Sequence, residues 1–261
     1  MLRIKLKDEV KDLFQYIAKS DTGKVREVNE DRVAVLRRSE GLLLAIVADG
    51  MGGHKAGDVA SEMTVQSLSN LFMQAEADCF VTNDRKKEWL SKSIRDINAS
   101  VFEHASTHPE CKGMGTTVIA ALIDNDDCVM GHVGDSRAYL IGDAVEQLTR
   151  DHSFVNALLD SGEITEAEAE VHPKKNWIVK ALGTEAGIEE EILQFSLSSL
   201  SYLLLCSDGL SNKVNKEEIA SIVLSSAPLS KKGEDLIGLA NRHGGEDNIS
   251  LVLLSSKVEG G

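Results

Sequence analysis

Apolar runs that end in an aspartate recur along this chain. Seven apolar residues, Leu42 to Ala48, are followed at once by Asp49-Gly50. The same layout recurs at Val129 to Val133 before Gly134-Asp135 and at Leu203 to Ser207 before Asp208-Gly209. A short apolar run that stops at turn residues is typical of a buried strand. The pattern therefore predicts three carboxylates at the exits of buried strands.

A fourth acid stands at a strand entrance, because Gly245-Glu246-Asp247-Asn248 precedes the apolar run Ile249 to Leu254. If these strands are neighbours, the four aspartates meet at one edge. Two like charges 4 Å apart cost roughly 4 kcal/mol at an effective dielectric of 20, so cations would be needed between them. Carboxylate oxygens suit Mg²⁺ or Mn²⁺ better than zinc. The alternative is that each Asp-Gly is only a turn.

Helical spacing fills the intervals between the strand groups. It predicts a helix over Asp58 to Phe72, a second through Trp89 to Val101, and a later pair over Lys216 to Leu224 and Gly233 to Arg242. Strands in groups with helix pairs between them favour an antiparallel α+β layering over a doubly wound parallel sheet. The polar segment 150–180 lies between strand regions and is predicted to be a surface flap.

Charge and composition exclude several classes of protein. The net charge of −14 over 261 residues argues against binding to nucleic acid or to an anionic membrane surface. No apolar run approaches the length of a membrane span, and the N-terminus lacks the apolar core of a secretory signal. The four cysteines show no CxxC spacing, which favours reduced thiols and a cytoplasmic location.

Eight motifs together resemble the metal-dependent PPM (type 2C) family of bacterial serine/threonine phosphatases. In chain order they are SDTGKVREVNEDR, VADGMGGHKAGDVAS, MGTTVIAA, GHVGDSRAYL, LTRDHS, ALG, LLCSDGL and GGEDNISL. The resemblance covers a domain from residue 20 to about 257 and leaves residues 1–19 as an N-terminal extension. It implies a four-layer α-β-β-α sandwich of two antiparallel sheets flanked by helix pairs.

The resemblance also implies roles for single residues. The metal-binding positions it carries over are Asp49 as the bridge between two ions, the Gly50 carbonyl, Asp208 and Asp247, with Asp135 at a third, weaker metal. The supporting positions are Glu30 and Asp31 as an acidic pair near the metals, Thr116 and Thr117 beside them, and Asn248 as the residue that orients Asp247.

Two further positions bear on the chemistry. Arg26 matches the arginine that grips the substrate phosphate, and a guanidinium can hold two phosphate oxygens in a fork. His54, in the glycine turn, is the candidate general acid for the leaving alkoxide. The alternatives are a surface arginine and a histidine that only donates hydrogen bonds. Asp151-His152 are interpreted as flap anchors with no chemical role. The turn from Gly50 to Gly53 lacks the GK[ST] ending of a phosphate-binding P-loop.

The resulting hypothesis is a hydrolase that releases phosphate from phosphoserine and phosphothreonine in proteins at a binuclear Mg²⁺ or Mn²⁺ centre. By family analogy it opposes a eukaryotic-like serine/threonine kinase, and it is expected to act as a monomer without nucleic acid or membrane. The alternative is a catalytically weak phosphoprotein-binding module of the same fold. A calcium-binding protein is disfavoured, because the acidic turn Asp124 to Asp127 lacks the calcium-loop pattern.

Overall fold

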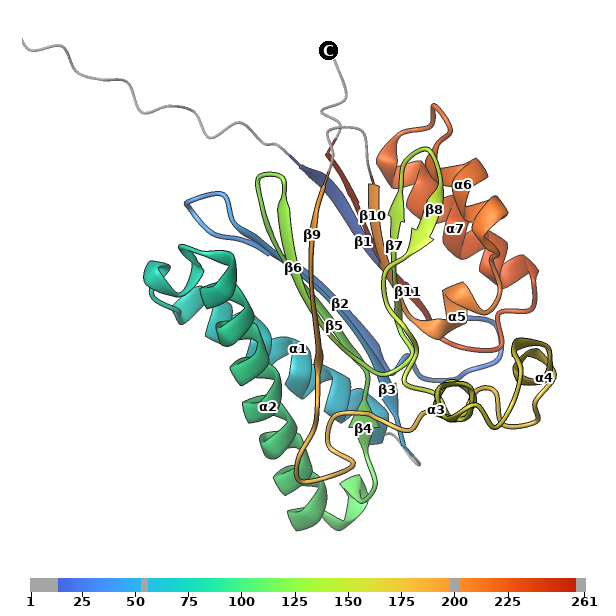
Figure 1. Ribbon diagram of the computed structural model, residues 1–261, viewed down its shortest axis with the longest axis horizontal. Helices are drawn as coiled ribbons and strands as arrows, with labels where there is room; N and C mark the ends of the chain where they lie inside the picture. The colour runs from blue at the N-terminus through green and yellow to red at the C-terminus, as the bar shows by residue number, and fades with distance from the viewer. Residues whose placement is uncertain (1–13, 53–55, 198–201, 257–261) are drawn as a thin grey trace, which may run out of the picture.

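The computed structural model describes residues 14–52, 56–197 and 202–256. Two antiparallel sheets lie face to face, with helices on both outer surfaces (Figure 1). One sheet has the strand order β2-β3-β5-β6-β9, with β4 paired to β3. Its strands are β2 (Asp31–Arg37), β3 (Leu43–Met51), β4 (Gly115–Thr116), β5 (Val118–Asp124), β6 (Asp127–Val133) and β9 (Glu191–Ser196).

The second sheet has the order β1-β11-β10-β7-β8. Its strands are β1 (Gln15–Asp21), β7 (Arg137–Ile141), β8 (Val145–Gln147), β10 (Tyr202–Cys206) and β11 (Ile249–Ser255). An acid lies just beyond one end of each of two strands: Asp208 follows β10, and Asp247 precedes β11. Because β10 and β11 run antiparallel, those two acids lie at the same end of the sheet.

Helices cover the outer faces of both sheets. The first sheet carries α1 (Ala56–Gln74) and α2 (Asn83–Thr107), and the second carries α6 (Lys216–Val223) and α7 (Leu229–Arg242). Short helices α3 (Phe154–Ser161) and α4 (Glu166–Glu170) lie in the predicted flap, and α5 (Asp208–Ser211) follows β10. Two 3₁₀ turns, Ala77–Phe80 and Pro109–Cys111, flank α2.

The long apolar run at Leu42 to Ala48 is explained by burial on both faces of β3. Leu44 and Ile46 pack toward α1 and α2, whereas Ala45 and Val47 pack into the core between the sheets. A strand covered on both sides has no solvated face, so its apolar residues do not alternate with polar ones. A third core lies between the second sheet and α6 and α7.

The four-layer arrangement expected from the sequence is confirmed. The predicted boundary at residue 20 falls inside a strand, because Gln15 to Lys19 pair with Ser255 to Leu251 of β11. Alternate side chains of β1 are exposed, so its sequence carries a weaker apolar signal than the central strands. Within the described ranges, no helix is both long and apolar enough to cross a membrane.

Candidate metal centre

The acids of the candidate site come from both sheets and meet at one end of the sandwich. Asp31 begins β2 and stands directly opposite Asp49 of β3 in the antiparallel register. Asp208 begins α5 immediately beyond β10, and Asp135 follows β6. Their mutual influence on acidity, described below, places all of them within electrostatic reach of Asp49.

Hydrogen bonds to the main chain fix the position of Asp49. Its amide donates to the Thr117 hydroxyl at 3.0 Å, and its carbonyl accepts from the Thr116 hydroxyl and the Thr117 amide, both at 2.9 Å. Thr116 and Thr117 are buried. The two threonines therefore act on the Asp49 backbone and leave its carboxylate free to face the other acids.

Gly50 lies where no other residue fits. A Cβ there would come within 2.2 Å of the Gly57 carbonyl oxygen, so only glycine fits at this position. The Gly50 amide donates to the Glu30 carbonyl at 3.2 Å, which joins the segment before β2 to the end of β3.

Asn248 ties three segments together with its side-chain amide. Its oxygen accepts from the Glu30 amide at 2.8 Å, and its nitrogen donates to the carbonyls of Thr22 and Val28. The contact with Asp247 is made by the Asn248 backbone, whose N–H donates to Asp247 Oδ1 at 2.9 Å. Asn248 therefore holds both the acid and the loop that carries Arg26.

Arg26 faces the acids across this loop. Its Nη2 donates to Asp247 Oδ2 at 2.9 Å, and both side chains are partly open to solvent. The guanidinium is therefore both close to the carboxylates and accessible to a ligand from outside.

Burial and mutual repulsion raise the pKa values of the clustered carboxyls. Burial raises the pKa of Asp49 well above its usual range, and the charges of Asp31, Asp208 and Asp135 add to the effect. Burial raises the pKa of Asp31 to about 7, against the lowering effect of the Ser207 hydroxyl. The pKa of Asp135 rises to about 8, through burial and then the charge of Asp208. Perturbed groups of this kind cluster at functional sites.

Two buried oxygen atoms in the cluster support cation binding. Asp31 Oδ1 and Asp135 Oδ1 are buried and accept no hydrogen bond from the part of the chain that the structure describes. Unpaired carboxylate oxygens in a group of mutually repelling acids fit a hard divalent cation such as Mg²⁺ or Mn²⁺. The donor set also lacks the thiolate and imidazole ligands that zinc prefers, within the described residues.

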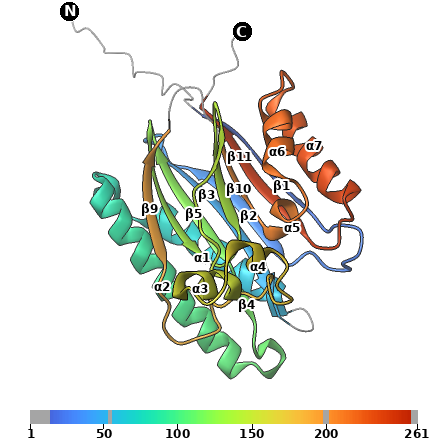
Figure 2. The ribbon, with the colours of Figure 1, turned by 45° about the vertical axis from the view of Figure 1, so that its right-hand side comes forward.

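A cleft of about 330 Å³ opens beside the acids. Asp208 and Asp247 line it together with Lys175 and Asn176 of the flap. Figure 2 brings the flap with α3 and α4 to the front, near the end of the sandwich where β4 lies. A substrate that reaches the acids through this cleft therefore meets the flap.

The predicted residues that the structure describes are brought together. Asp49, Asp135, Asp208 and Asp247 form the cluster, and Glu30, Asp31, Thr116, Asn248 and Arg26 surround it. His54, the candidate general acid, lies outside the described residues. Ser207 was not predicted as a site residue, yet its hydroxyl donates to Asp31 Oδ2 at 2.8 Å. Its position directly before Asp208 in LLCSDGL is the only signal in the sequence that could have indicated it.

Comparison with known proteins gives a consistent result. The protein phosphatase 2C family matches residues 23–242. The chain is 42% identical to the serine/threonine phosphatase Stp of Listeria innocua, over 92% of this chain and 95% of that protein. It is 40% identical to the protein phosphatase PhpP of Streptococcus pneumoniae, over 92% of this chain and 96% of that protein.

Solved structures resemble the whole fold. A serine/threonine phosphatase of S. agalactiae superimposes with a TM-score of 0.88 at 38% identity, covering 94% of this chain and 100% of that one. The catalytic domain of the phosphatase PstP, solved with two manganese ions, superimposes with a TM-score of 0.78 at 34% identity, covering 93% and 97%.

Proposed function

The chain belongs to the protein phosphatase 2C family and is a metal-dependent serine/threonine phosphatase, and we propose that the acid cluster at the end of its sandwich is the catalytic centre. The observation that carries the proposal is the group of buried, mutually repelling carboxyls around Asp49. The structure of PstP with two manganese ions supports the choice of metal.

We assign the metal positions to Asp49, the Gly50 carbonyl, Asp208 and Asp247, with Asp135 at a third ion. When bound, divalent ions lower the pKa of a water and offset charge on the transferring phosphoryl group. The role of the chain is to hold them: the threonines fix Asp49, and Asn248 and Ser207 fix the acids opposite. Glu30 and Asp31 are assigned as the acidic pair that lies next to these ligands.

Arg26 binds the substrate phosphate in this proposal. In the structure its Nη2 pairs with Asp247, and because the side chain is partly exposed, the guanidinium can turn toward a phosphate dianion. The phosphoryl transition state is loose, so positioning and charge account for most of the catalysis. The leaving serine or threonine oxygen needs a proton, which we assign to His54.

The substrates are phosphoproteins, and we propose a eukaryotic-like serine/threonine kinase as the opposing enzyme. Both Listeria Stp and pneumococcal PhpP are phosphatases of this family, which supports the proposal by analogy. We also propose a cytoplasmic location, which is supported by four free cysteines, three of them buried.

The test is phosphate release from phosphothreonine and phosphotyrosine peptides, with Mn²⁺ and with excess chelator. We expect hydrolysis of the phosphothreonine peptide with Mn²⁺, little hydrolysis of the phosphotyrosine peptide, and none of either with chelator. Activity that persists in excess chelator would contradict the metal mechanism. A chain that binds phosphopeptides without any turnover in Mn²⁺ would instead be the phosphoprotein-binding module.

A further inference from the structure

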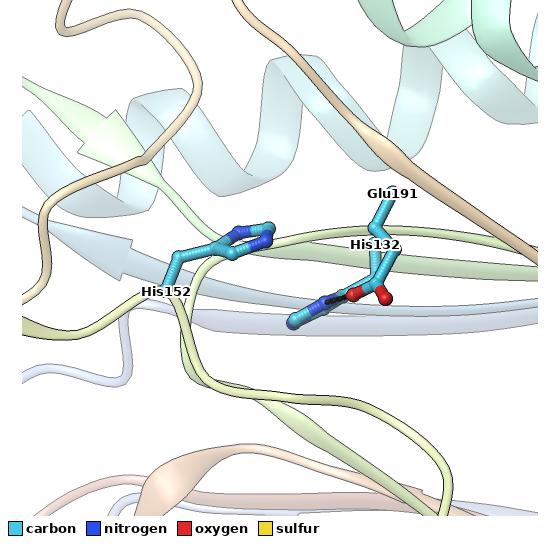
Figure 3. Close-up of side chains that lie close together, drawn as sticks. All are labelled: His132, His152 and Glu191. Atoms are coloured by element: carbon cyan, nitrogen blue, oxygen red, sulfur yellow. Dashed lines mark ion pairs between the residues drawn. The ribbon is translucent and has the colours of Figure 1, made fainter. Parts of the chain in front are cut away.

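Two histidines and a glutamate gather at the base of the flap, outside the acid cluster. His132 of β6 stands opposite Glu191 of β9 in the antiparallel register, and its Nδ1 lies 3.6 Å from Glu191 Oε2. The ring of His152 stacks on that of His132, with centroids 4.8 Å apart and an angle of 24° (Figure 3). Ligand atoms of the three residues lie within 4.8 Å of one another, the arrangement of a possible metal site.

One hydrogen bond decides against a metal ion at this cluster. The backbone N–H of Gly134 donates to Nδ1 of His152 at 3.0 Å, so this nitrogen carries no proton. In a neutral ring the proton is then on Nε2. A metal ion on Nε2 would need the opposite tautomer, and metal-bound histidines use their second nitrogen to donate to an acceptor. A backbone N–H at Nδ1 is the wrong partner for that.

The same histidine holds the next peptide group from the other side. The His152 amide donates to the Gly134 carbonyl at 2.8 Å, so side chain and backbone of one residue bind both the N–H and the C=O of Gly134. Gly134 has φ +111°, and a Cβ there would lie 2.5 Å from the Thr117 side chain. Its conformation is thus open only to glycine, and because glycine is flexible, the hydrogen bonds to its N–H and C=O restrict the conformations it adopts.

Gly134 directly precedes Asp135, whose Oδ1 is buried and unpaired within the described residues. The orientation of the Gly134–Asp135 peptide sets where this carboxylate points. His152 and the residue after it also contact the far end of the flap. The Val179 amide donates to the His152 carbonyl at 2.8 Å, and Ser153 forms a β-bridge with Ile178. His152 therefore connects the closed base of the flap to the residue that carries the third metal position.

We propose that His152 is a positioning residue that aims Asp135 at its metal ion through the two hydrogen bonds to Gly134, and so couples that ion to the flap. This inference rests on the proposed role of Asp135 as a metal ligand. His132, which is fully buried, contributes the stacked ring that keeps the His152 imidazole in this orientation.

The side chain can be tested with two amides of different reach. In His152→Asn, the amide oxygen takes the place of Nδ1 and can accept from Gly134. In His152→Gln, the amide lies farther out, near the place of Nε2, and the Gly134 N–H loses its acceptor. Loss of an outer contact of this kind weakens metal binding by about tenfold or more. We expect a weaker third Mn²⁺ in His152→Gln and His152→Ala, and near wild-type binding in His152→Asn.

The measurement is calorimetric titration of the metal-free protein with Mn²⁺, which separates the weak site from the tight ones without any substrate. His172→Gln is the matched control. Its Nδ1 also accepts a backbone N–H within the flap, from Lys174 at 3.1 Å, but this bond does not involve Gly134. We expect the control to bind all Mn²⁺ ions as the wild type does.

A second measurement needs no variant. Nitrogen-15 NMR of the metal-free wild type reports which nitrogen of His152 is protonated, and we expect Nδ1 to be bare. A protonated Nδ1, a stoichiometric zinc ion bound by His132, His152 and Glu191, or unchanged binding of the third Mn²⁺ in His152→Gln would each overturn the proposal. If wild type failed to hydrolyse phosphopeptides, the proposed function would fall while these readouts would still decide the role of His152.

Discussion

The acid cluster meets the base of the flap, residues 151–154 and 177–179, at Gly134-Asp135. The two regions are built in different ways. In the acid cluster, carboxylates stand on strand ends whose backbones are held by buried threonines and by Asn248. In the flap base, loop segments are joined through side chains. Arg137 forms a bidentate salt bridge with Asp151, from Nε to Oδ1 at 2.9 Å and from Nη2 to Oδ2 at 2.7 Å, and His152 accepts a hydrogen bond from Gly134. The first region is built to hold charge in place, and the second to connect a surface segment to it.

This difference predicts that substitutions in the acid cluster lower phosphatase activity the most. Asp208→Asn removes a negative charge that binds the ions. Loss of a residue that only contacts a metal ligand lowers activity by up to about a hundredfold, so loss of a ligand should lower it by more than about a hundredfold. Phosphate release from a phosphothreonine peptide at saturating Mn²⁺ measures this. Asp235→Asn, at an exposed ion pair on α7, should leave the rate unchanged. A fully active Asp208→Asn would remove the metal assignment.

Arg26 comes next, because it acts on the substrate and leaves the metals in place. Arg26→Ala should raise KM by about tenfold to a hundredfold, the equivalent of one charge-assisted hydrogen bond of about 1.5–3 kcal/mol. Arg26→Lys should recover only part of the loss, since an ammonium cannot form the paired contact. Steady-state kinetics measure both variants, with Arg85→Ala on the exposed face of α2 as the control. Equal kinetics for Arg26→Ala and wild type would show that Arg26 is only a surface residue.

The flap should matter for protein substrates and little for small ones. The variant replaces residues 161–175 with a glycine-serine segment of equal length and keeps the hydrogen bonds between 152–154 and 177–179. Because Lys175 lines the cleft beside Asp208, we expect a several-fold loss on phosphoproteins and nearly unchanged hydrolysis of an aryl phosphate. Losses of the same size on both substrates would mean that the flap acts through the metal centre alone.

The position of each acid could be predicted because its signal is local, whereas spacing along the chain did not show that the acids converge. A buried strand that stops at Asp-Gly is visible in a short window, as at Asp49 and Asp208, and the motif order supplied their partners. The apolar runs at Leu42 to Ala48, Val129 to Val133, Leu203 to Ser207 and Ile249 to Leu254 correspond to the buried strands β3, β6, β10 and β11. β8 and β9 were not predicted, because most of their side chains are half-exposed and their sequences contain no continuous apolar run.

The flap base was harder, since its contacts join residues far apart in the chain. Asp151-His152 could be interpreted as anchors, but no sequence pattern shows that His152 binds Gly134 or stacks on His132. Ser207 was missed for the same reason: its partner Asp31 is 176 positions away. Such pairings follow from the packing of two sheets, which spacing along the chain does not encode.

The smallest expected effect concerns pH and compares the cluster with and without metal. Asp31 and Asp135 have pKa values raised to about 7 and about 8 in the folded metal-free chain, against about 3.9 in an unfolded one. Between these limits the folded state keeps protons that the unfolded state has lost, so its stability falls as pH rises. The Tm of the metal-free protein should therefore decrease from about pH 5 to about pH 8.

Saturating Mn²⁺ should reverse this trend, because it binds the ionised carboxylates of the folded state. Asp135→Asn should flatten the metal-free slope. A metal-free Tm that rises over this range would show that burial and the neighbouring acids do not raise these pKa values in the folded chain.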